Sequence, residues 1–506
     1  MRLLLCTIRT GSPESGLALK NLYNVVAEAP IDTTIREYRM GDADRSIYEE
    51  LMKEKYDLLY FHCDLYNEAK IDHIAQLIKK AVPSTVVIVG GMPVTAETKA
   101  YMAKNPEVDY VIRGEEEGVF FRFIHTILTY RFEFAGLDGL AYRDGENIVV
   151  NPIGEPMRYE DMPFAYEHFS VEEGSTVCYE SSRGNPDRCY YRQLLPDRKI
   201  RSLSLARVCS ELRYFIIKKA EKVIFVDKWF NFGKERAYRI FEYLINNDNG
   251  VTTFCFDING DLLDEETILL LGHARKGLFE FTVDIESTNA EPLDAAGRKA
   301  NIYQLMYNIS KVIQNGNIRV TVKQRAGLPC ETPELFARAF NKIYGLHADR
   351  FDIEVLHMVK GCVLRSEAAN YGYRFDSEVP YEVIANDFMP ADRMIDIVRL
   401  SKILELYQEY FADSLNRILG DTGRKAYDFF MGLTDFISEK GYMNLLHLEE
   451  ERYRVLYAYA AGIYDERGEN LKLQILMEVM THELEKHFGT EAVKRLERKG
   501  WDLNVK

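Results

Sequence analysis

The sequence has no closely spaced cysteine pair, no long apolar run and no excess of positive charge. Its eight cysteines are scattered without C-x2-C spacing, and a chain of 506 residues needs no disulfides, so we expect buried, reduced thiols. The longest apolar run, "STVVIVGGM", is far shorter than a membrane span. The 79 acidic residues outnumber the 64 basic ones and give a net charge of −15, which argues against a nucleic-acid partner.

Several common signatures are also absent. The chain has no Walker-type phosphate loop, no H-E-x-x-H zinc motif and no G-x-S-x-G nucleophile motif. No leader is visible, because "MRLLLC" is followed at once by the polar stretch "TIRTGSPES". We therefore expect a cytoplasmic protein that has no membrane partner.

The first part of the chain, residues 1–135, alternates short apolar strands with helical segments. This alternation predicts an α/β fold with a doubly wound, Rossmann-like parallel sheet. Ligands of such sheets bind beyond the carboxyl ends of the strands. The candidate loops are therefore those after Ile8, Phe61, Val89 and Ile112.

The rest of the chain divides into three further parts. Residues 136–173 predict a linker with one hairpin that has an Asp-Gly turn. Six strands alternate with helices over residues 174–375, which predicts a partial, TIM-like (β/α)6 barrel. Residues 376–506 contain long amphipathic stretches and predict a helical domain. Function would lie at the barrel strand ends, where the sequence places Asp227, Asp257, Glu286, Lys323 and His357.

Two stretches near the N-terminus carry a family resemblance. "VVIVGGMPVT" and "NPEVDYVIRGEEEGVF" are similar to the signature of the cobalamin-binding domain of cobalamin-binding radical S-adenosylmethionine proteins. In the barrel region "VDKWFNFGKERA", "DINGDLLDEE", "DIESTNAEPL", "RAGLPCET" and "VKGCVLRSEAANYGY" resemble successive strand-end motifs of a clostridial-type subgroup with a helical C-terminal extension. The resemblance covers nearly the whole chain.

This resemblance implies a set of cofactor-binding residues. The glycines would let the backbone approach the corrin and its nucleotide tail, and Thr95 would donate a hydrogen bond there. Since there is no D-x-H-x-x-G motif, the resemblance implies base-off cobalamin with no histidine below the cobalt. The implied residues are Ser12, His62, Asn67, Gly90, Gly91, Thr95, Arg113, Gly114, Glu115, Asp227 and Asp257.

Three of these residues leave alternatives open. His62 would either ligate cobalt or act as a polar residue beside the cofactor. Asp227 and Asp257 would either hydrogen-bond a nucleoside or substrate, or cap the helix that follows each of them.

The cluster-binding loop of the family departs from its pattern here. "SSRGNPDRCYYRQ", residues 181–193, would match C-x3-C-x2-C if Asn185 and Arg192 were cysteines, but Cys189 alone remains. Amide and guanidinium groups are unsuitable ligands for iron, and Cys178 and Cys209 are too distant in sequence to complete a compact loop. A 4Fe–4S cluster is therefore not expected, while S-adenosylmethionine remains a candidate cofactor.

Charged residues accompany this loss. Asp284 and Glu286 lie on one face of one strand, and the next strand reads Lys323-Gln324-Arg325. The charges would form either buried ion pairs that replace the lost cofactor, or a remodelled site for an anionic or polar ligand. The candidate catalytic residues are Arg192, Asp284, Glu286 and Lys323.

Two functions follow, and a third is ranked last. The first is an enzyme that kept cobalamin, lost the cluster and performs polar methyl or alkyl transfer on a small-molecule substrate, with an anionic one favoured. The second is a non-catalytic cobalamin carrier or sensor, or the partner of an intact paralogue or a redox protein. The third is a radical enzyme with unconventional cluster ligands. We favour the first.

Overall fold

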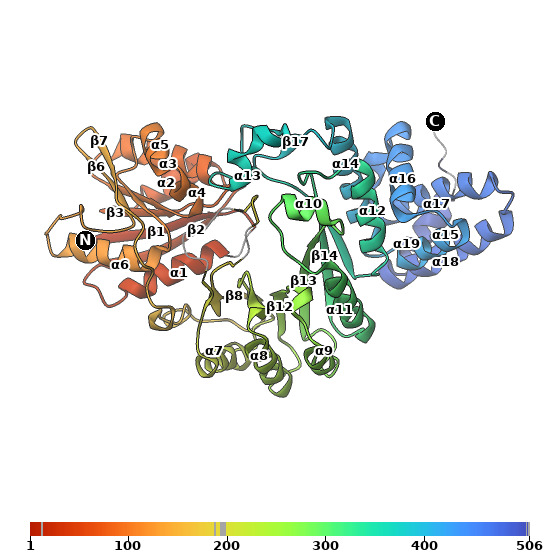
Figure 1. Ribbon diagram of the computed structural model, residues 1–506, viewed down its shortest axis with the longest axis horizontal. Coiled ribbons are helices and arrows are strands. Elements are labelled where there is room, and N and C mark those ends of the chain that lie inside the picture. The colour runs from red at the N-terminus through yellow and green to blue at the C-terminus, as the bar shows by residue number, and fades with distance from the viewer. Residues whose placement is uncertain (12–13, 187–188, 193–198, 502, 504–506) are drawn as a thin grey trace.

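A computed structural model describes residues 1–11, 14–186, 189–192, 199–501 and 503 (Figure 1). Within these residues, a sheet covered by helices on both faces is followed by a parallel sheet backed by helices, and then by a group of helices. The α/β class, the Rossmann-like first domain, the partial barrel and the C-terminal helices predicted from the sequence are confirmed. No helix of the described part is long and apolar enough to span a membrane.

The first sheet has the order β2-β1-β3-β4-β5-β6-β7. The first five strands are parallel, and β1 and β3 are almost wholly buried because helices cover both faces of the sheet. These strands are β1 (Arg2–Arg9), β2 (Asp32–Arg39), β3 (Leu58–His62), β4 (Val86–Gly90) and β5 (Tyr110–Ile112).

The helices divide between the two faces of this sheet (Figure 1). On one face, α1 (Glu14–Val26) and α6 (Glu116–Leu128) bury Leu22 and Phe123. On the other face, Ile74 and Met102 come from helices of that layer. That layer contains α2 (Asp44–Leu51), α3 (Glu68–Ala81) and α5 (Thr98–Lys104), and the short α4 (Met92–Ala96) follows β4 directly.

The hairpin predicted as part of a linker belongs to this first sheet. β6 (Leu140–Asp144) pairs antiparallel with β5, and β7 (Asn147–Val150) pairs with β6. The sheet therefore extends beyond the predicted boundary at residue 135. The reason is that Leu140 and Ala141 are fully buried against the sheet's helices, a burial that the local pattern of the hairpin did not reveal.

The second sheet is parallel and keeps the order of the sequence, from β8 at one edge to β15 at the other. Its strands are β8 (Thr176–Tyr179), β11 (Lys222–Phe225), β12 (Thr253–Asp257), β13 (Phe279–Glu286), β14 (Arg319–Ala326) and β15 (Arg350–Val355). The helices behind it are α7 (Leu205–Ile217), α8 (Lys234–Asn246), α9 (Glu265–Leu271), α11 (Ile302–Asn315) and α12 (Pro333–Tyr344). The short β9 (Ser182–Arg183) and β10 (Arg201–Ser202) pair beside β8.

The two faces of this sheet differ in chemistry. Phe279, Phe281 and Val283 of β13 are buried in the apolar core, whereas Thr282 and Asp284 alternate with them and are half-buried. The same alternation in β14 leaves Lys323 and Arg325 half-buried between Val322, Gln324 and Ala326. Because successive side chains of a strand point to opposite faces, one face of the partial barrel is apolar and the other is charged.

The C-terminal helices share an apolar core with the barrel. Tyr427 lies against Phe336 and Phe340 of α12, with ring centroids 6.2 Å and 5.6 Å apart. The helices are α14 (Ala391–Tyr407), α15 (Ala412–Thr422), α16 (Ala426–Lys440), α17 (Glu449–Asp465), α18 (Asn470–Phe488) and α19 (Thr490–Lys499).

Phe411, fully buried against Tyr407 and Tyr453, lies at the break between α14 and α15. One detail of this region differs from the sequence prediction of a helical domain. The region contains a strand, β17 (Val383–Ala385), which pairs with β16 (Arg374–Phe375).

The turn after β4 depends on Gly91. Its φ is +116°, and a Cβ atom there would lie 1.9 Å from the backbone oxygen of Cys63. Gly91 is therefore required by the packing of one strand end against another, whether or not a cofactor approaches it.

We predict that Gly91→Ala strongly destabilises the protein. The matched control is Gly145→Ala in the β6–β7 turn, where φ is +60° but a Cβ atom would meet nothing within 4 Å. The control carries only the left-handed backbone cost of about 1–2 kcal/mol. Thermal melting of both variants measures the difference, and equal melting temperatures would show that the Cys63 contact does not constrain this turn.

Candidate functional site

His62 lies at the carboxyl end of β3, beside Thr7 of β1 and Gly90 of β4. Its Nδ1 is 3.2 Å from Glu116 Oε2, and the Tyr60 hydroxyl donates a 2.8 Å hydrogen bond to the same carboxylate oxygen. Burial favours the neutral imidazole, but the Glu116 charge outweighs burial, so the pKa of His62 is raised. The three side chains form one buried chain of polar contacts.

Gly90 makes room for this chain. A Cβ atom at position 90 would lie 2.3 Å from both Glu116 Oε1 and the Tyr60 hydroxyl. The glycine pair of the sequence motif thus serves two local contacts, the His62 network at Gly90 and the Cys63 carbonyl at Gly91.

Asn67 and Thr95, which the resemblance assigned to the cofactor, make hydrogen bonds within the protein. Asn67 donates to the Ile8 carbonyl at 3.0 Å, and Thr95 donates to the Gly91 carbonyl at 3.0 Å. The Thr95 hydroxyl also accepts from the backbone of Gly114 at 3.3 Å, so it joins two loops of the sheet edge.

The resemblance also assigned Arg113 and Ser12 to the cofactor. Arg113 donates to the Thr98 hydroxyl at 2.9 Å and to the Asn151 carbonyl at 2.6 Å, and thereby holds the end of the hairpin. Ser12 lies outside the described residues.

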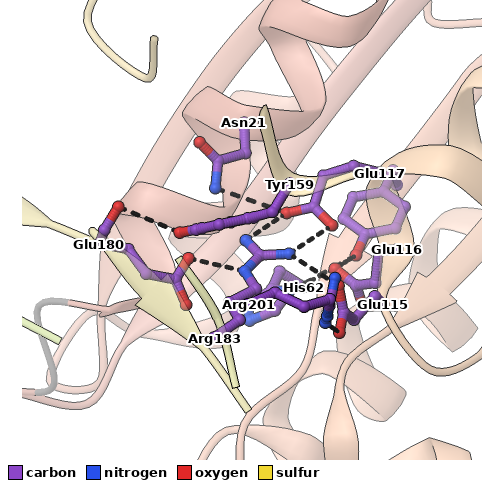
Figure 2. Close-up of polar contacts among 10 residues, drawn as sticks. Asn21, His62, Glu115, Glu116, Glu117, Tyr159, Glu180, Arg183 and Arg201 are labelled. Atoms are coloured by element: carbon purple, nitrogen blue, oxygen red, sulfur yellow. Dashed lines mark hydrogen bonds and ion pairs between the residues drawn. The ribbon is translucent and has the colours of Figure 1, made fainter. Parts of the chain in front are cut away.

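The acidic N-terminus of α6 joins the first domain to the barrel (Figure 2). Arg183 of β9 donates to both Glu117 oxygens at 2.6 Å and 2.9 Å, and its Nε donates to Glu180 at 2.8 Å. Glu115 pairs with Arg183 at 3.4 Å and also with Arg201 of β10. The Arg183 side chain is 14% exposed and Glu117 is 8% exposed, so this bridge is largely shielded from water.

The charge of Arg183 acts on the pKa of the neighbouring carboxyl groups of Glu117 and Glu180. Burial would raise the pKa of Glu117, but the two hydrogen bonds and the charge of Arg183 lower it. Burial raises the pKa of Glu180 despite the same arginine. The guanidinium also lies over the Tyr159 ring, 5.3 Å from the ring centroid, which is within the distance of a cation–π contact.

Arg192 and Asp284 meet at the mouth of the barrel. Arg192 donates to Asp284 Oδ2 at 2.7 Å and lies 3.6 Å from Glu286 Oε1. Their side chains are 28% and 30% exposed, so the pair faces solvent only in part. Burial alone would raise the pKa of Asp284, but Arg192 and Arg325 lower it.

Glu286 occupies a strained position behind this pair. Its φ is +66°, next to a shift of register in β13, and its side chain is 1% exposed. The Tyr191 hydroxyl donates to its Oε1, and Arg298 Nε lies 3.5 Å from Oε2. A left-handed backbone at a buried acid costs of the order of 1–3 kcal/mol and is most often found at functional sites.

The remaining sequence candidates lie around this centre. Lys323 pairs with Glu354 at 2.8 Å, and the same acid accepts from Arg325 at 3.1 Å. Arg325 stacks 5.1 Å above the Tyr191 ring. Lys323 is the cross-strand neighbour of Asp284, and its charge also lowers the pKa of that carboxyl.

Asp227 and Asp257 differ in role. Asp227 is 1% exposed and accepts hydrogen bonds from the Ser181 backbone at 2.8 Å and its hydroxyl at 2.7 Å, so it fixes the start of the loop. Asp257 is exposed at the end of β12. His357 pairs through its backbone with Glu382, and burial lowers its pKa while the charges of Glu382, Arg325 and Glu354 act on the same ring.

Two cavities lie where the first domain faces the barrel. Met92 and Lys228 line both cavities, so the two are neighbours. The cavity of about 280 Å³ is lined among others by His62, Gly91, Gly114, Glu117 and Arg183. The cavity of about 410 Å³ is lined among others by Asn185, Arg192, Asp257, Asp284 and Arg298.

The residues of the first cavity fit cobalamin. Gly91 and Gly114, which have no side chains, line the same cavity as the imidazole of His62. The Glu116 carboxylate orients that imidazole. Bare backbone suits the close approach of a flat ring, and an oriented imidazole suits a metal. Cobalamin would therefore lie at this strand edge, toward the barrel.

The described residues do not fit a 4Fe–4S cluster. Within the described part of the chain, no three His, Cys, Asp or Glu side chains come together in a way that could hold a metal ion. Cys189 is buried, and Arg192 of the same loop points to Asp284. A guanidinium has no lone pair for iron, so this position cannot supply a ligand.

Sequence reasoning missed several residues of this region. The acidic triplet at positions 115–117 was visible, but its partners Arg183 and Arg201 lie more than 60 residues away in sequence, as separations of 66 and 86 show. Tyr60 has the sequence context of an ordinary tyrosine in an apolar strand. Long-range pairing of this kind leaves no local signal.

We predict that Arg183→Met lowers the melting temperature clearly. Removing one partner of a buried ion pair costs roughly 3–5 kcal/mol, and Glu117 would be left uncompensated. The matched control is Arg158→Met, whose pair with Asp161 is solvent-exposed and should leave melting unchanged. Equal melting of the two variants would contradict the role of the bridge.

Comparisons with known proteins agree with this geometry. Residues 5–123 match the B12 binding domain family, and residues 369–499 match a protein family of unknown function, DUF4080. The chain is 24% identical over 323 residues to the cobalamin-dependent radical SAM methyltransferase TokK of Streptomyces tokunonensis, covering 58% of this chain and 46% of TokK. It is 23% identical over 293 residues to the anaerobic magnesium-protoporphyrin IX monomethyl ester cyclase of Rubrivivax gelatinosus, covering 54% and 51%. The chain thus spans about half the length of these curated relatives.

Solved structures share the fold. The radical S-adenosylmethionine methyltransferase TsrM of Kitasatospora setae superposes with a TM-score of 0.60 at 16% identity, over 78% of this chain and 81% of TsrM. The cobalamin-dependent S-adenosylmethionine radical enzyme OxsB superposes with a TM-score of 0.60 at 14% identity, over 99% and 84%. With the matched B12-binding domain and the curated relatives, this shared fold makes the chain similar to cobalamin-binding radical S-adenosylmethionine proteins.

Proposed function

We propose that this chain is a cobalamin-dependent transferase that works without an iron–sulfur cluster and moves a methyl or alkyl group by polar chemistry. The observation that carries the proposal is the Arg192–Asp284 ion pair, which occupies a position where the family resemblance expects a cluster cysteine. The B12-binding domain supports the cobalamin half of the proposal, and the methyltransferase relatives support the reaction class.

Cobalamin supplies, when bound, a nucleophilic cobalt(I) centre and a methyl–cobalt bond, so polar group transfer needs no electron from an iron–sulfur cluster. The chain's own residues then have to bind and orient the second reactant. The cavity at the barrel mouth adjoins the His62 cavity through Met92 and Lys228, so a reactant held there faces the cofactor edge.

Arg192 and Asp284 suit a zwitterionic or anionic reactant. The guanidinium offers a planar fork of donors that matches a carboxylate, and Asp284 offers an acceptor for an ammonium group. Both line the same cavity, together with Arg298. S-Adenosylmethionine carries a carboxylate and an ammonium on one carbon and fits this pattern of charges.

Glu286 and Lys323 act through other residues. Glu286 holds Tyr191, and Lys323 shares Glu354 with Arg325, which stacks on the Tyr191 ring. These contacts fix the segment that carries Arg192. We therefore assign Glu286 and Lys323 to positioning, and Arg192 and Asp284 to ligand contact.

A non-catalytic role is the second candidate. The Arg192–Asp284 and Lys323–Glu354 pairs are complete without any ligand, as structural ion pairs would be. A cobalamin carrier, a sensor or the partner of an intact paralogue would need no more. A neighbouring gene that encodes all three cluster cysteines, together with no turnover of S-adenosylmethionine by this chain alone, would favour this role.

We predict that anaerobic reconstitution with iron and sulfide yields no stoichiometric 4Fe–4S cluster. The physical reason is that Asn185 and Arg192 supply no thiolate. Iron and sulfide analysis, with spectroscopy of the reduced protein, measures the result. About four irons and four sulfides per chain would contradict the proposal and restore the radical mechanism.

Two variants control this experiment. Cys189→Ala should leave any residual iron unchanged, because that iron is bound non-specifically. The double variant Asn185→Cys with Arg192→Cys restores the C-x3-C-x2-C spacing and should gain iron relative to the parent chain. A parent chain that already holds as much iron as the double variant would show that other residues supply the ligands.

We predict that Arg192→Met weakens binding of S-adenosylmethionine at least tenfold, about 1.4 kcal/mol. The partly exposed ion pair contributes less to stability than a buried one, so melting should change little. Calorimetric titration and thermal melting measure the two effects.

The matched control is Arg275→Met. Arg275 is 33% exposed and pairs with Asp248 at 2.7 Å, a similar ion pair that lines neither cavity. It should retain full binding. A lower melting temperature with unchanged binding in Arg192→Met would instead make Arg192 structural.

A further inference from the structure

His62 occupies the position where a sheet of this topology binds its ligand. The parallel strands have the order β2-β1-β3-β4-β5, so the chain reverses direction across the sheet between β1 and β3. Ligands of open α/β sheets bind in the crevice beyond the strand ends at this switch point. His62 is the last residue of β3 and pairs with Thr7 of β1.

The imidazole is held with one nitrogen toward the protein. Nδ1 contacts Glu116 Oε2 at 3.2 Å, and Tyr60 fixes that oxygen from behind at 2.8 Å. Within the part of the chain that the structure describes, Nε2 makes no hydrogen bond, and His62 lines the cavity at the strand edge. Figure 2 shows His62 beside Glu116, near the Arg183 bridge.

This arrangement is the one that metal-ligating histidines adopt. Such a histidine almost always donates its second ring N–H to a carboxylate or carbonyl, which fixes the tautomer and the ring orientation. With the proton on Nδ1 and directed to Glu116, the lone pair of Nε2 is available in the cavity. A histidine that only completes a buried polar network would not need to leave Nε2 at the cavity surface.

We propose that His62 is the lower axial ligand of the cobalt, in place of the cofactor's own base, with Glu116 and Tyr60 as positioning residues. The inference rests on the proposed binding of cobalamin and differs from the resemblance, which implies no histidine below the cobalt. One Nε2–cobalt bond forms, and the bond from cobalt to water or to the benzimidazole nitrogen breaks. A proton on Nε2 leaves to solvent, and the other proton stays on Nδ1, which donates it in the hydrogen bond to Glu116.

Gly90 makes room for the Glu116 carboxylate and the Tyr60 hydroxyl that orient His62. Any side chain there would meet the Glu116 carboxylate and the Tyr60 hydroxyl, each 2.3 Å from an added Cβ atom. The glycine thereby keeps the carboxylate beneath the imidazole. Gly90, the first glycine of the motif, thus leaves room for the residues that orient His62 rather than for the corrin.

The test is electron paramagnetic resonance of the protein loaded with cobalamin and reduced to cobalt(II). One axial nitrogen-14 splits each cobalt line into a triplet, and nitrogen-15 splits it into a doublet. Protein labelled with nitrogen-15 histidine should give doublets, and cobinamide, which lacks the nucleotide base, should still show axial nitrogen in unlabelled protein. Triplets that persist in the labelled protein, or the absence of nitrogen splitting, would overturn the proposal.

Variants sharpen this result. His62→Gln should bind cobinamide and lose the nitrogen splitting, whereas His125→Gln, which changes an exposed histidine of α6, should retain it. Glu116→Gln should keep the corrin and increase the fraction of cobalt without axial nitrogen. The labelling experiment on the unchanged chain decides the case even if a variant fails to fold. If the chain retains no corrin at all, the proposed function itself fails, which differs visibly from corrin bound without histidine.

Discussion

The bridge between Arg183 and the acidic N-terminus of α6 at Glu115–Glu117 sets the geometry on which the candidate site depends. It ties the strand edge that carries His62 to the first hairpin of the barrel, next to the loop that carries Arg192. Arg183 and Glu117 line the cavity that contains His62, and this cavity shares Met92 and Lys228 with the cavity at the barrel mouth. Because Arg183 and Glu117 are mostly shielded from water, the bridge is specific to this arrangement of the two domains. Loss of the bridge would remove these contacts between the strand edge of His62 and the β9–β10 hairpin.

The sequence predicted the layers of the fold well, because each layer has a local signal. Buried strands such as β1 and β3 are nearly continuous apolar runs, and α11 has the spacing of an amphipathic helix. The hairpin of β6 and β7 was misplaced in a linker because its pairing with β5 depends on residues far along the chain. Phe411 is buried against Tyr407 and Tyr453 at the break between α14 and α15, and the contact with Tyr453 likewise joins residues far apart in the sequence.

The candidate site could be predicted only in part. The sequence singled out Arg192, Asp284 and Glu286, and the structure brings them together. It assigned Asn67, Thr95 and Arg113 to the cofactor, which stays a prediction, and their hydrogen bonds join loops of the first domain. A motif records which residues accompany a binding edge, but it does not separate those that shape the edge from those that touch the ligand. The Tyr60–Glu116 support for His62 left no local signal, because its members are 56 residues apart.

The most direct test of the account is anomalous diffraction at the cobalt and iron absorption edges, from one crystal of anaerobically purified protein loaded with cobalamin. The account predicts one cobalt peak at the carboxyl ends of β3 and β4, within bonding distance of His62 Nε2. It also predicts no iron peak beside Cys189. An iron peak in the loop that carries Arg192, or a cobalt peak away from this strand edge, would contradict it.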